Sequence, residues 1–414
     1  MAQTITLIED ILKYKYQPAL ANQIGIDPSP FLEKIRKTPA TNNTIVAAAP
    51  IGVNGGFGFG AEGVGTPSAG SQRYEKFSLD MVDMYVDIQI SNKTVQLGSS
   101  NQASMINALD QEIMGSYASA KWNIGRSLFG DGTGKLCALT SADTNGSSTS
   151  TIEVDDCSKL VEGLTVDIYT YATDAATDGT LAAANKGLRI LGIDRENKVI
   201  TVNSASLAVT VAKVGDDAPT AAGTYGFITV QNSYKRELCG LGAIFDSAIT
   251  TLYGLTKASH TWLAPTVVNA SNDITDLVLY EGVKKAKDYK GSEIDMILMG
   301  DAAFSAYQTY MRENNIVLAD KQRFEGGAVG YNVIVGSQNV TVVNEKFVPT
   351  NEAYGVNTRD FYLEQTPWDF VSKDGGIFSL MEGTSIYRAL LASYGNLMCV
   401  KPGGCVRFTN CNAA

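Results

Sequence analysis

The sequence contains few of the residues from which catalytic and metal centres are usually built. Histidine occurs once in 414 residues, at His260, and the six cysteines include no Cys-x-x-Cys pair. One histidine cannot build a typical zinc centre, and scattered cysteines in a chain without a secretory signal are usually reduced thiols. We therefore expect no metal site, no cofactor and free thiols at Cys137, Cys157, Cys239, Cys399, Cys405 and Cys411.

Long apolar runs and positive charge are also scarce. No run approaches the ~18 apolar residues of a membrane span, and the segment Met1–Ile5 lacks the basic and apolar blocks of a secretory signal. The formal net charge of −10 argues against a protein that wraps nucleic acid in a basic surface. We expect folding in a cytosol, no membrane contact and only loose contact with DNA.

Charged residues make up only 18% of the chain, whereas glycine occurs 40 times. Such a balance is typical of a chain whose surface is largely covered by neighbouring molecules. The composition therefore favours assembly.

One long helical pattern, from Asn101 to Phe129, stands out because no proline interrupts it. At roughly 1.5 Å per residue the helix would be about 43 Å long. The glycine-rich segment Gly130-Asp131-Gly132-Thr133-Gly134 is expected to end it. Apolar residues at steps of three and four place one stripe along its length: Ile106, Leu109, Ile113, Tyr117, Ala120, Ile124 and Leu128.

The residues before this helix predict three successive segments: an arm, a loop and a strand. Residues 3–41 predict a partly helical arm, because a short amphipathic run is followed by three prolines. Residues 47–72 predict a long loop that gains order by lying on something else. Alternation from Phe77 to Ile90 predicts one long strand with a bulge near Val82. The arm prediction rests on Ile5, Ile8, Ile11, Leu12, Pro18, Pro28 and Pro30. The loop prediction rests on the glycine-rich run Gly55, Gly56, Phe57, Gly58, Phe59 and Gly60. The strand prediction rests on the alternating residues Leu79, Met81, Met84, Val86 and Ile88, together with Phe77 and Ile90.

Strand-length pieces rich in Thr, Ala, Gly and Val fill residues 140–230 and predict an all-β insertion with small-barrel geometry. Within it, Leu188–Ile193 and Val199–Val202 form a predicted hairpin. Beyond residue 237 the pattern is mixed. It predicts a helix at 273–289 ended by Gly291, a buried strand at 294–299, a helix at 301–314 capped by Asp301, and strands at 333–335, 340–343, 360–363, 388–392 and 397–400.

Catalytic signatures are weak. Gly58–Gly63 matches G-x-G-x-x-G, with Asp80 about twenty residues on, but no strand precedes it and no helix can follow it. Gly130–Lys135 follows a helix instead of preceding one, unlike a phosphate loop. His260 is interpreted as structural, and Asp83 and Asp87 as one solvated face of a strand. Nothing therefore anchors an enzymatic function.

The order of elements resembles the major capsid proteins of tailed bacteriophages, which have the Hong Kong 97-type fold. The order is a proline-broken arm, a glycine-rich loop, a strand, a long helix ending in Phe129–Gly134, a β insertion, and an α+β half that begins at Leu238-Cys239-Gly240-Leu241. A second local match runs from Tyr253-Gly254-Leu255 to Trp262. The likeness spans nearly the whole chain.

The resemblance implies an α+β architecture with named parts. Residues 1–46 would be an N-terminal arm and 47–97 the extended loop with its β-strands, lying across a neighbouring subunit. A peripheral domain with a spine helix would hold 98–139, 236–271 and 349–397, a β-rich insertion domain 140–235, and an axial domain 272–348 and 398–414. The spine helix and its stop would include Ile106, Leu109, Ile113, Ile124, Leu128, Gly130, Asp131 and Gly132.

The implied function is mechanical. Hexamers and pentamers of this chain would form an icosahedral shell around double-stranded DNA, in a virion assembled in the host bacterial cytoplasm, with a portal and a separate scaffolding protein as partners. No lysine lies between Lys37 and Lys76, so an isopeptide crosslink at the loop tip is not expected. Three alternatives remain: an encapsulin-like cellular shell, a β-rich surface or adhesin protein, and an enzyme of unknown type.

Overall fold

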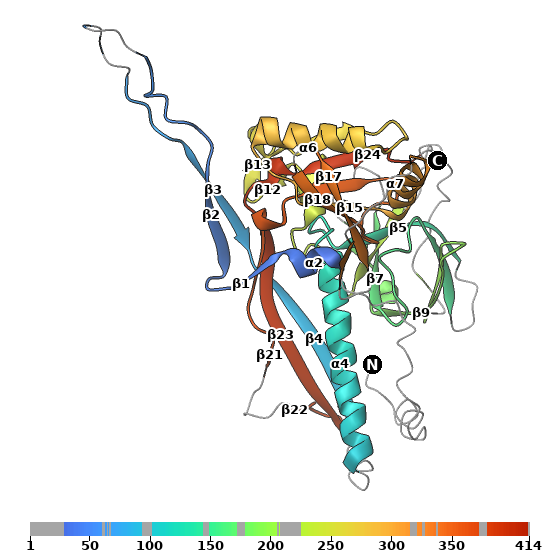
Figure 1. Cartoon of the computed structure of the whole chain (residues 1–414). Helices are drawn as coiled ribbons and strands as arrows, with labels where there is room; N and C mark the ends of the chain where they lie inside the picture. The colour runs from blue at the N-terminus through green and yellow to red at the C-terminus, as the bar shows by residue number, and fades with distance from the viewer. Residues whose placement is uncertain are drawn as a thin grey trace.

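The structure, a computed structural model, describes residues 29–59, 63, 65, 68–92, 102–143, 149–171, 179–204, 207, 225–314, 321–324, 328–336, 338–371 and 379–412. For residues 102–113 it describes the backbone alone. The described elements form a sheet beside a long helix, a β barrel, a second sheet with two helices, and a projecting hairpin (Figure 1). In this part of the chain no helix has both the length and the apolar character needed to cross a membrane.

The long helix α4 (Gln102–Ser127) confirms the predicted helix, at 26 residues or about 39 Å. Among its described side chains, burial increases toward the C-terminal end: Met114 is 70% exposed and Trp122 3%, and Leu128, directly after the helix, is fully buried. Tyr117, placed on the predicted apolar stripe, is 41% exposed. The side chains of Ile106, Leu109 and Ile113 lie outside the described ones.

The sheet beside α4 is organised around one long strand, β23 (Ile386–Cys399). The two strands predicted at 388–392 and 397–400 are therefore one strand. The polar residues between them are buried and bonded, not turned to solvent: Ser393 Oγ donates to the Thr366 carbonyl, and Asn396 Nδ2 donates to that of Asp80. Its partners are β4 (Val82–Ser91), β20 (Phe361–Gln365), β21 (Asp369–Phe370) and β22 (Ser379–Leu380), and β1 (Arg36–Pro39) pairs with β20.

The projecting hairpin consists of β2 (Thr44–Pro50) and β3 (Tyr74–Asp80). The predicted loop at 47–72 is therefore too long at its start, where residues 47–50 are paired in β2. The predicted single strand through Phe77–Ile90 is also wrong. It is two strands in two sheets, β3 on β2 and β4 on β23, because the backbone changes partner at Met81, whose N–H donates to the Asn43 carbonyl.

The insertion is a closed barrel, as its strand-length pieces and size predicted. Pairing runs from β11 through β5, β6, β10, β9 and β7 and returns to β11, and β8 pairs with the C-terminal part of β7. The predicted hairpin is confirmed as β9 and β10. The strands are β5 (Lys135–Asp143), β6 (Ser150–Val154), β7 (Thr165–Tyr171), β8 (Thr180–Leu181), β9 (Leu188–Asp194), β10 (Val199–Val202) and β11 (Tyr225–Val230).

The second sheet has the strand order β14-β24-β19-β15-β18-β17-β16, and α6 (Asp276–Lys290) and α7 (Asp301–Glu313) share one apolar core with it. Helix α6 ends at Gly291, as predicted, with φ 60°. Asp301 is not the cap of α7: Gly300 takes that place, and Asp301 accepts from Asn344 Nδ2 at 2.7 Å. The strands are β14 (Thr266–Asn269), β15 (Met296–Met299), β16 (Lys321–Arg323), β17 (Val329–Val335), β18 (Gln338–Asn344), β19 (Ala353–Val356) and β24 (Val406–Thr409).

Short elements complete the described chain. The predicted arm is described only from Ser29 onward, where Pro30 opens the helix α2 (Pro30–Lys34). Between β11 and β14 the chain forms the helix α5 (Leu241–Phe245) and the strand pair β12 (Thr251–Leu252) and β13 (Leu255–Thr256). The 3₁₀ turns are η2 (Ala183–Asn185), η3 (Thr261–Leu263), η4 (Thr358–Asp360) and η5 (Pro402–Gly404).

A buried carboxyl ties the start of the described chain to the body. Ser29 Oγ donates to Glu345 Oε2 at 2.5 Å, and Glu345 is 1% exposed. Desolvation raises the pKa of Glu345 to about 7, although the bond from Ser29 acts in the opposite direction. The contribution of this group to folding is therefore fully present below its unfolded pKa near 4.5 and is lost as the pH rises through about 7.

We predict that Glu345→Gln flattens the pH dependence of folding. The free energy of unfolding of the wild type, relative to that of the variant, should fall by about 3 kcal/mol between pH 4.5 and 8, since one pKa unit corresponds to about 1.4 kcal/mol. Urea titrations followed by tryptophan fluorescence measure it, because Trp122 packs on Phe347. Glu153→Gln, at an exposed site on β6, is the matched control. A constant difference across this pH range would contradict the assignment.

Candidate assembly surfaces

The tip of the β2–β3 hairpin exposes large apolar side chains. Phe57 is 79% exposed, Phe59 97% and Val53 92%. The two phenylalanine rings meet edge to face, with centroids 5.3 Å apart. Burying one phenylalanine side chain stabilises a structure by roughly 1.5–3 kcal/mol, so an uncovered pair favours a partner surface. Of the predicted loop residues, Gly60 lies outside the described ones.

Glycines let the two arms of this loop approach closely. A Cβ on Gly70 would lie 2.5 Å from the backbone nitrogen of Gly55, a distance that real side chains do not reach. Asn54 Oδ1 accepts from the Gly56 N–H at 3.0 Å beside this contact. The loop is therefore a narrow, two-stranded finger with Phe57 and Phe59 beyond its closest point.

The base of the hairpin is fixed to the body by aromatic packing. Phe77 is fully buried, with its ring stacked on Trp262 at 5.7 Å and 5.5 Å from that of Tyr253. The Ser78 N–H donates to the Tyr253 carbonyl at 3.1 Å. Figure 1 shows the hairpin leaving the body from this point and projecting away from it. The segment Tyr253 to Trp262, noted in the sequence, thus holds the base while the tip stays bare.

The C-terminal end of α4 forms a junction with a second noted segment, Leu238-Cys239-Gly240-Leu241. The Leu241 N–H donates to the Leu128 carbonyl at 2.7 Å, and a Cβ on Gly240 would lie 2.3 Å from that same oxygen. Only glycine permits this approach. Two glycine motifs, about 110 residues apart in the sequence, therefore pack against each other.

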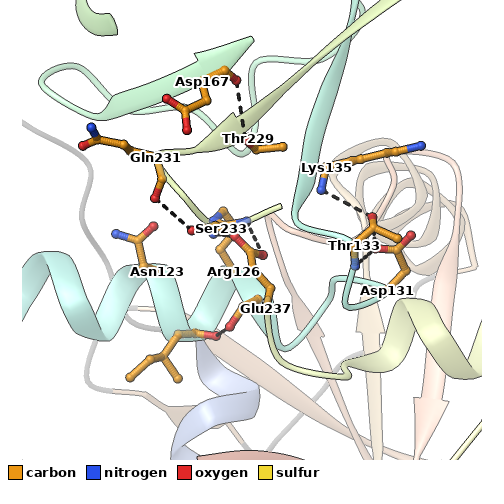
Figure 2. A network of polar contacts seen from close by, with 12 residues as sticks. Asn123, Arg126, Asp131, Thr133, Lys135, Asp167, Thr229, Gln231, Ser233 and Glu237 are labelled. Atoms are coloured by element: carbon orange, nitrogen blue, oxygen red, sulfur yellow. Dashed lines mark hydrogen bonds and ion pairs between the residues drawn. The ribbon is translucent and has the colours of Figure 1, made fainter. Parts of the chain in front are cut away.

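The glycine-rich stop itself is a tight turn. Gly132 and Gly134 have φ of 88° and 78°, a region that favours glycine. Asp131 Oδ1 accepts from the backbone N–H and the hydroxyl of Thr133, at 2.9 and 2.6 Å. The turn leads directly into β5 of the barrel, so it redirects the chain from the helix into the insertion (Figure 2).

A buried ion pair locks this junction. Arg126, on α4, donates from Nη1 and Nη2 to the two carboxylate oxygens of Glu237, at 3.0 and 2.6 Å. The side chains are 4% and 8% exposed. Figure 2 shows the pair between the helix and the chain that returns from the barrel. No sequence pattern predicts this pair, because an arginine near a helix end and a glutamate 111 residues later form no local pattern.

A cavity of about 330 Å³ lies beside this ion pair. Its walls come from β4, α4 and the segment after β11. Asn123 and Arg126 both line it, and two of their buried atoms, Asn123 Oδ1 and Arg126 Nε, have no hydrogen-bond partner in the described part of the chain.

The residues considered for catalysis do not converge. His260 Nδ1 lies 3.0 Å from the Thr256 carbonyl, and its ring meets that of Trp262 edge on. Asp83 and Asp87 are both exposed on β4, whereas Asp80, at the end of β3, accepts from the hydroxyl of Thr44 on β2. No cluster of three or more His, Cys, Asp or Glu residues occurs among the residues that the structure describes.

All six cysteines are free. Burial raises the pKa of the Cys239 thiol to about 12 and raises that of the Cys137 thiol as well. Neither thiol is therefore activated as a nucleophile at neutral pH.

Comparison with known proteins rests on structure, since neither a protein-family model nor a curated protein matches the sequence. The capsid asymmetric unit of cyanophage A-1(L) aligns over 96% of both chains, with a TM-score of 0.50 and 12% identity. The SrpI encapsulin of Synechococcus elongatus PCC 7942 aligns over 99% of this chain and 96% of its own, with a TM-score of 0.45 and 9% identity. A protein of Mycobacterium phage Bobi aligns over 98% of both chains, with a TM-score of 0.43 and 9% identity.

The first of these similarities, at a TM-score of 0.50 over almost the full length, establishes the fold. The chain has the α+β, Hong Kong 97-type fold of phage capsid proteins, as the order of its elements indicated. At 12% identity the likeness concerns the fold alone.

We predict that breaking the Arg126–Glu237 pair is strongly destabilising. Arg126→Met leaves a buried carboxylate without its partner and should cost about 3–5 kcal/mol of unfolding free energy. Adding Glu237→Leu should recover much of that loss, because no uncompensated charge remains. Arg388→Met is the matched control, since its pair with Asp87 is exposed and is worth at most about 1 kcal/mol. Equal costs for Arg126→Met and Arg388→Met in urea unfolding would contradict the prediction.

Proposed function

We propose that this chain is the major capsid protein of a tailed bacteriophage, a structural protein that assembles into an icosahedral shell around double-stranded DNA. The fold shared with the cyanophage A-1(L) capsid over 96% of both chains is the observation that carries the proposal. The exposed hairpin tip supports it, because Phe57 and Phe59 find no cover within the described part of their own subunit. Interface energy then takes the place that catalysis has in an enzyme.

The parts of the subunit take the following roles in this proposal. The β2–β3 hairpin is the extended loop that lies across a neighbouring subunit, and α4 is the spine helix of a peripheral domain. The sheet with α6 and α7 is the axial domain, which gathers around five-fold and six-fold axes of pentamers and hexamers. That sheet also includes β14 and β19, so the boundaries drawn at residues 271 and 349 from the sequence fall inside it. The barrel is the insertion domain.

The proposed partners follow from the same role. The chain contacts other copies of itself, a portal and a separate scaffolding protein, in a virion assembled in the host cytoplasm. Its net charge of −10 suits a lining along which DNA moves without being gripped by its phosphates. No cofactor or metal is required.

An encapsulin-like cellular shell is the alternative, since the fold is compatible with either kind of container. The barrel at 135–230 favours a virus, because encapsulin chains generally lack such an insertion. A surface adhesin and an enzyme have less support. The long helix and the shell fold disfavour the first, and for the second the described residues considered for catalysis do not converge.

Electron microscopy and sedimentation of the purified chain, alone and with the products of neighbouring genes, test the proposal. Icosahedral shells, or rings of five and six subunits, are the expected result. Co-purified enzyme cargo inside shells formed by the chain alone would favour the encapsulin alternative. A persistent monomer in the presence of a scaffolding protein would overturn both.

We predict that replacing the two exposed rings with serine, in Phe57→Ser plus Phe59→Ser, leaves the subunit folded but impairs assembly. The rings contribute to a neighbour and not to the core of their own chain, so the unfolding free energy should change by less than about 0.5 kcal/mol while the yield of shells falls at least tenfold. Sedimentation velocity measures the yield. The matched control, Phe57→Tyr plus Phe59→Tyr, keeps both rings and should assemble; full assembly of the serine variant would refute the role of the tip.

A further inference from the structure

The neck of the finger carries the dipeptide Asn54-Gly55. The side-chain amide carbon of an asparagine and the backbone nitrogen of the next residue can close a succinimide ring, in which that nitrogen acts as the nucleophile. Glycine hinders this attack least, because it has no Cβ beside the nitrogen. The pair is therefore a candidate for a reaction within the chain.

The structure leaves this pair accessible. Residues 51–59 belong to no helix or strand, and Asn54 and Gly55 are both exposed. A Cβ built on Gly55 would meet no other atom within 4 Å, so that side of the residue is open, whereas another side packs on Gly70. Water can therefore reach the pair, and no regular element holds its backbone.

One hydrogen bond prepares the side-chain amide for attack. The Gly56 N–H donates to Asn54 Oδ1 at 3.0 Å. Because this bond bridges Gly55, it folds the side chain back over the backbone of that residue. The same oxygen gains negative charge when a nucleophile adds to the amide carbon. A backbone N–H already aimed at it stabilises that charge, as the donors of an oxyanion hole do.

We propose that Asn54-Gly55 is a site of spontaneous covalent modification in the folded subunit. The Gly55 nitrogen bonds to the Asn54 amide carbon, the bond from that carbon to the side-chain nitrogen breaks, and ammonia leaves with the proton that Gly55 gave up to solvent. Water then adds to one carbonyl of the succinimide and breaks its bond to the Gly55 nitrogen. The product is aspartate, or isoaspartate if the main-chain bond breaks. Nothing is oxidised or reduced, and water is the co-reactant.

The two products differ in their effect on the finger. Aspartate adds a negative charge at the neck and keeps an oxygen that can accept the existing hydrogen bond. Isoaspartate also lengthens the main chain by a methylene group. The arms leave no room for it, since a Cβ on Gly70 would lie 2.5 Å from the Gly55 nitrogen and 2.7 Å from Asn54 Oδ1. The arms must therefore separate, and Phe57 and Phe59 beyond the neck change direction.

Modification in this way ages the finger of a subunit that has not yet bound a neighbour. The exposed rings lose the direction in which the neck held them, while the core of the subunit stays folded, because the finger projects away from it (Figure 1). This consequence for assembly rests on the proposed shell function, whereas the reaction itself does not.

Peptide mapping by mass spectrometry tests the reaction on the full chain, kept in mildly alkaline buffer below the concentration at which it assembles. Deamidation raises the mass of the tryptic peptide Thr38–Arg73 by about 1 Da, and fragmentation assigns the change to a residue. Asn54 should react about tenfold faster or more than Asn42 and Asn43 of the same peptide, because residues with side chains follow those two.

The matched variant is Gly55→Ala, because the open space at this position accepts a methyl group. Its urea midpoint of unfolding should equal that of the wild type, while the rate at Asn54 falls by about tenfold or more. Equal rates in the two proteins would overturn the proposal. A slower rate at Asn54 in the folded wild type than in the same chain unfolded in urea would also overturn it, because the fold would then protect the amide.

The yield of shells from fresh and aged protein tests the consequence. Aged wild type should assemble several-fold less well than fresh wild type, whereas aged and fresh Gly55→Ala should assemble equally. Equal yields from fresh and fully modified wild type would overturn the effect on the finger. If fresh wild type did not assemble at all, the shell function would fail, and the mass measurement would still decide the reaction.

Discussion

The junction at the C-terminal end of α4 is the constraint on which the rest of the subunit depends. Here the helix, the turn into the barrel and the return from the barrel meet within a few ångströms, held by the buried Arg126–Glu237 pair and by the contact of Gly240 with Leu128. Buried charges need partners, and the close approach of the two backbones needs glycine. The helix and the chain that returns from the barrel therefore cannot move independently of each other. The rest of α4 extends from this fixed point (Figure 1).

The β2–β3 hairpin and the helix α4 both project from the body, and each is held firmly at one end. The hairpin is anchored by Phe77 between Tyr253 and Trp262, and α4 by its last turns, while each extends a poorly covered surface outward. A subunit built this way is stable before it meets its neighbours and still has apolar area left to bury against them. Such a division suits stepwise assembly, because folding and association use different residues.

Local pattern was enough to predict elements but not their partners. The long helix, the β9–β10 hairpin, the barrel and the Gly291 stop all rest on neighbouring residues. The errors have one origin, the tertiary context of a few side chains. Buried, hydrogen-bonded Ser393 and Asn396 made β23 look like two strands, and the change of partner at Met81 looked like a bulge. The Arg126–Glu237 pair was invisible because its members are 111 residues apart.

The first and last strands of the barrel are neighbours, with Lys135 of β5 opposite Thr229 of β11. The chain therefore enters and leaves the insertion at one place. An excursion with such closely spaced ends is modular: it can be lengthened, shortened or exchanged for another compact domain without moving the helix or either sheet. The outer surface of the subunit can thus diversify while its framework stays the same.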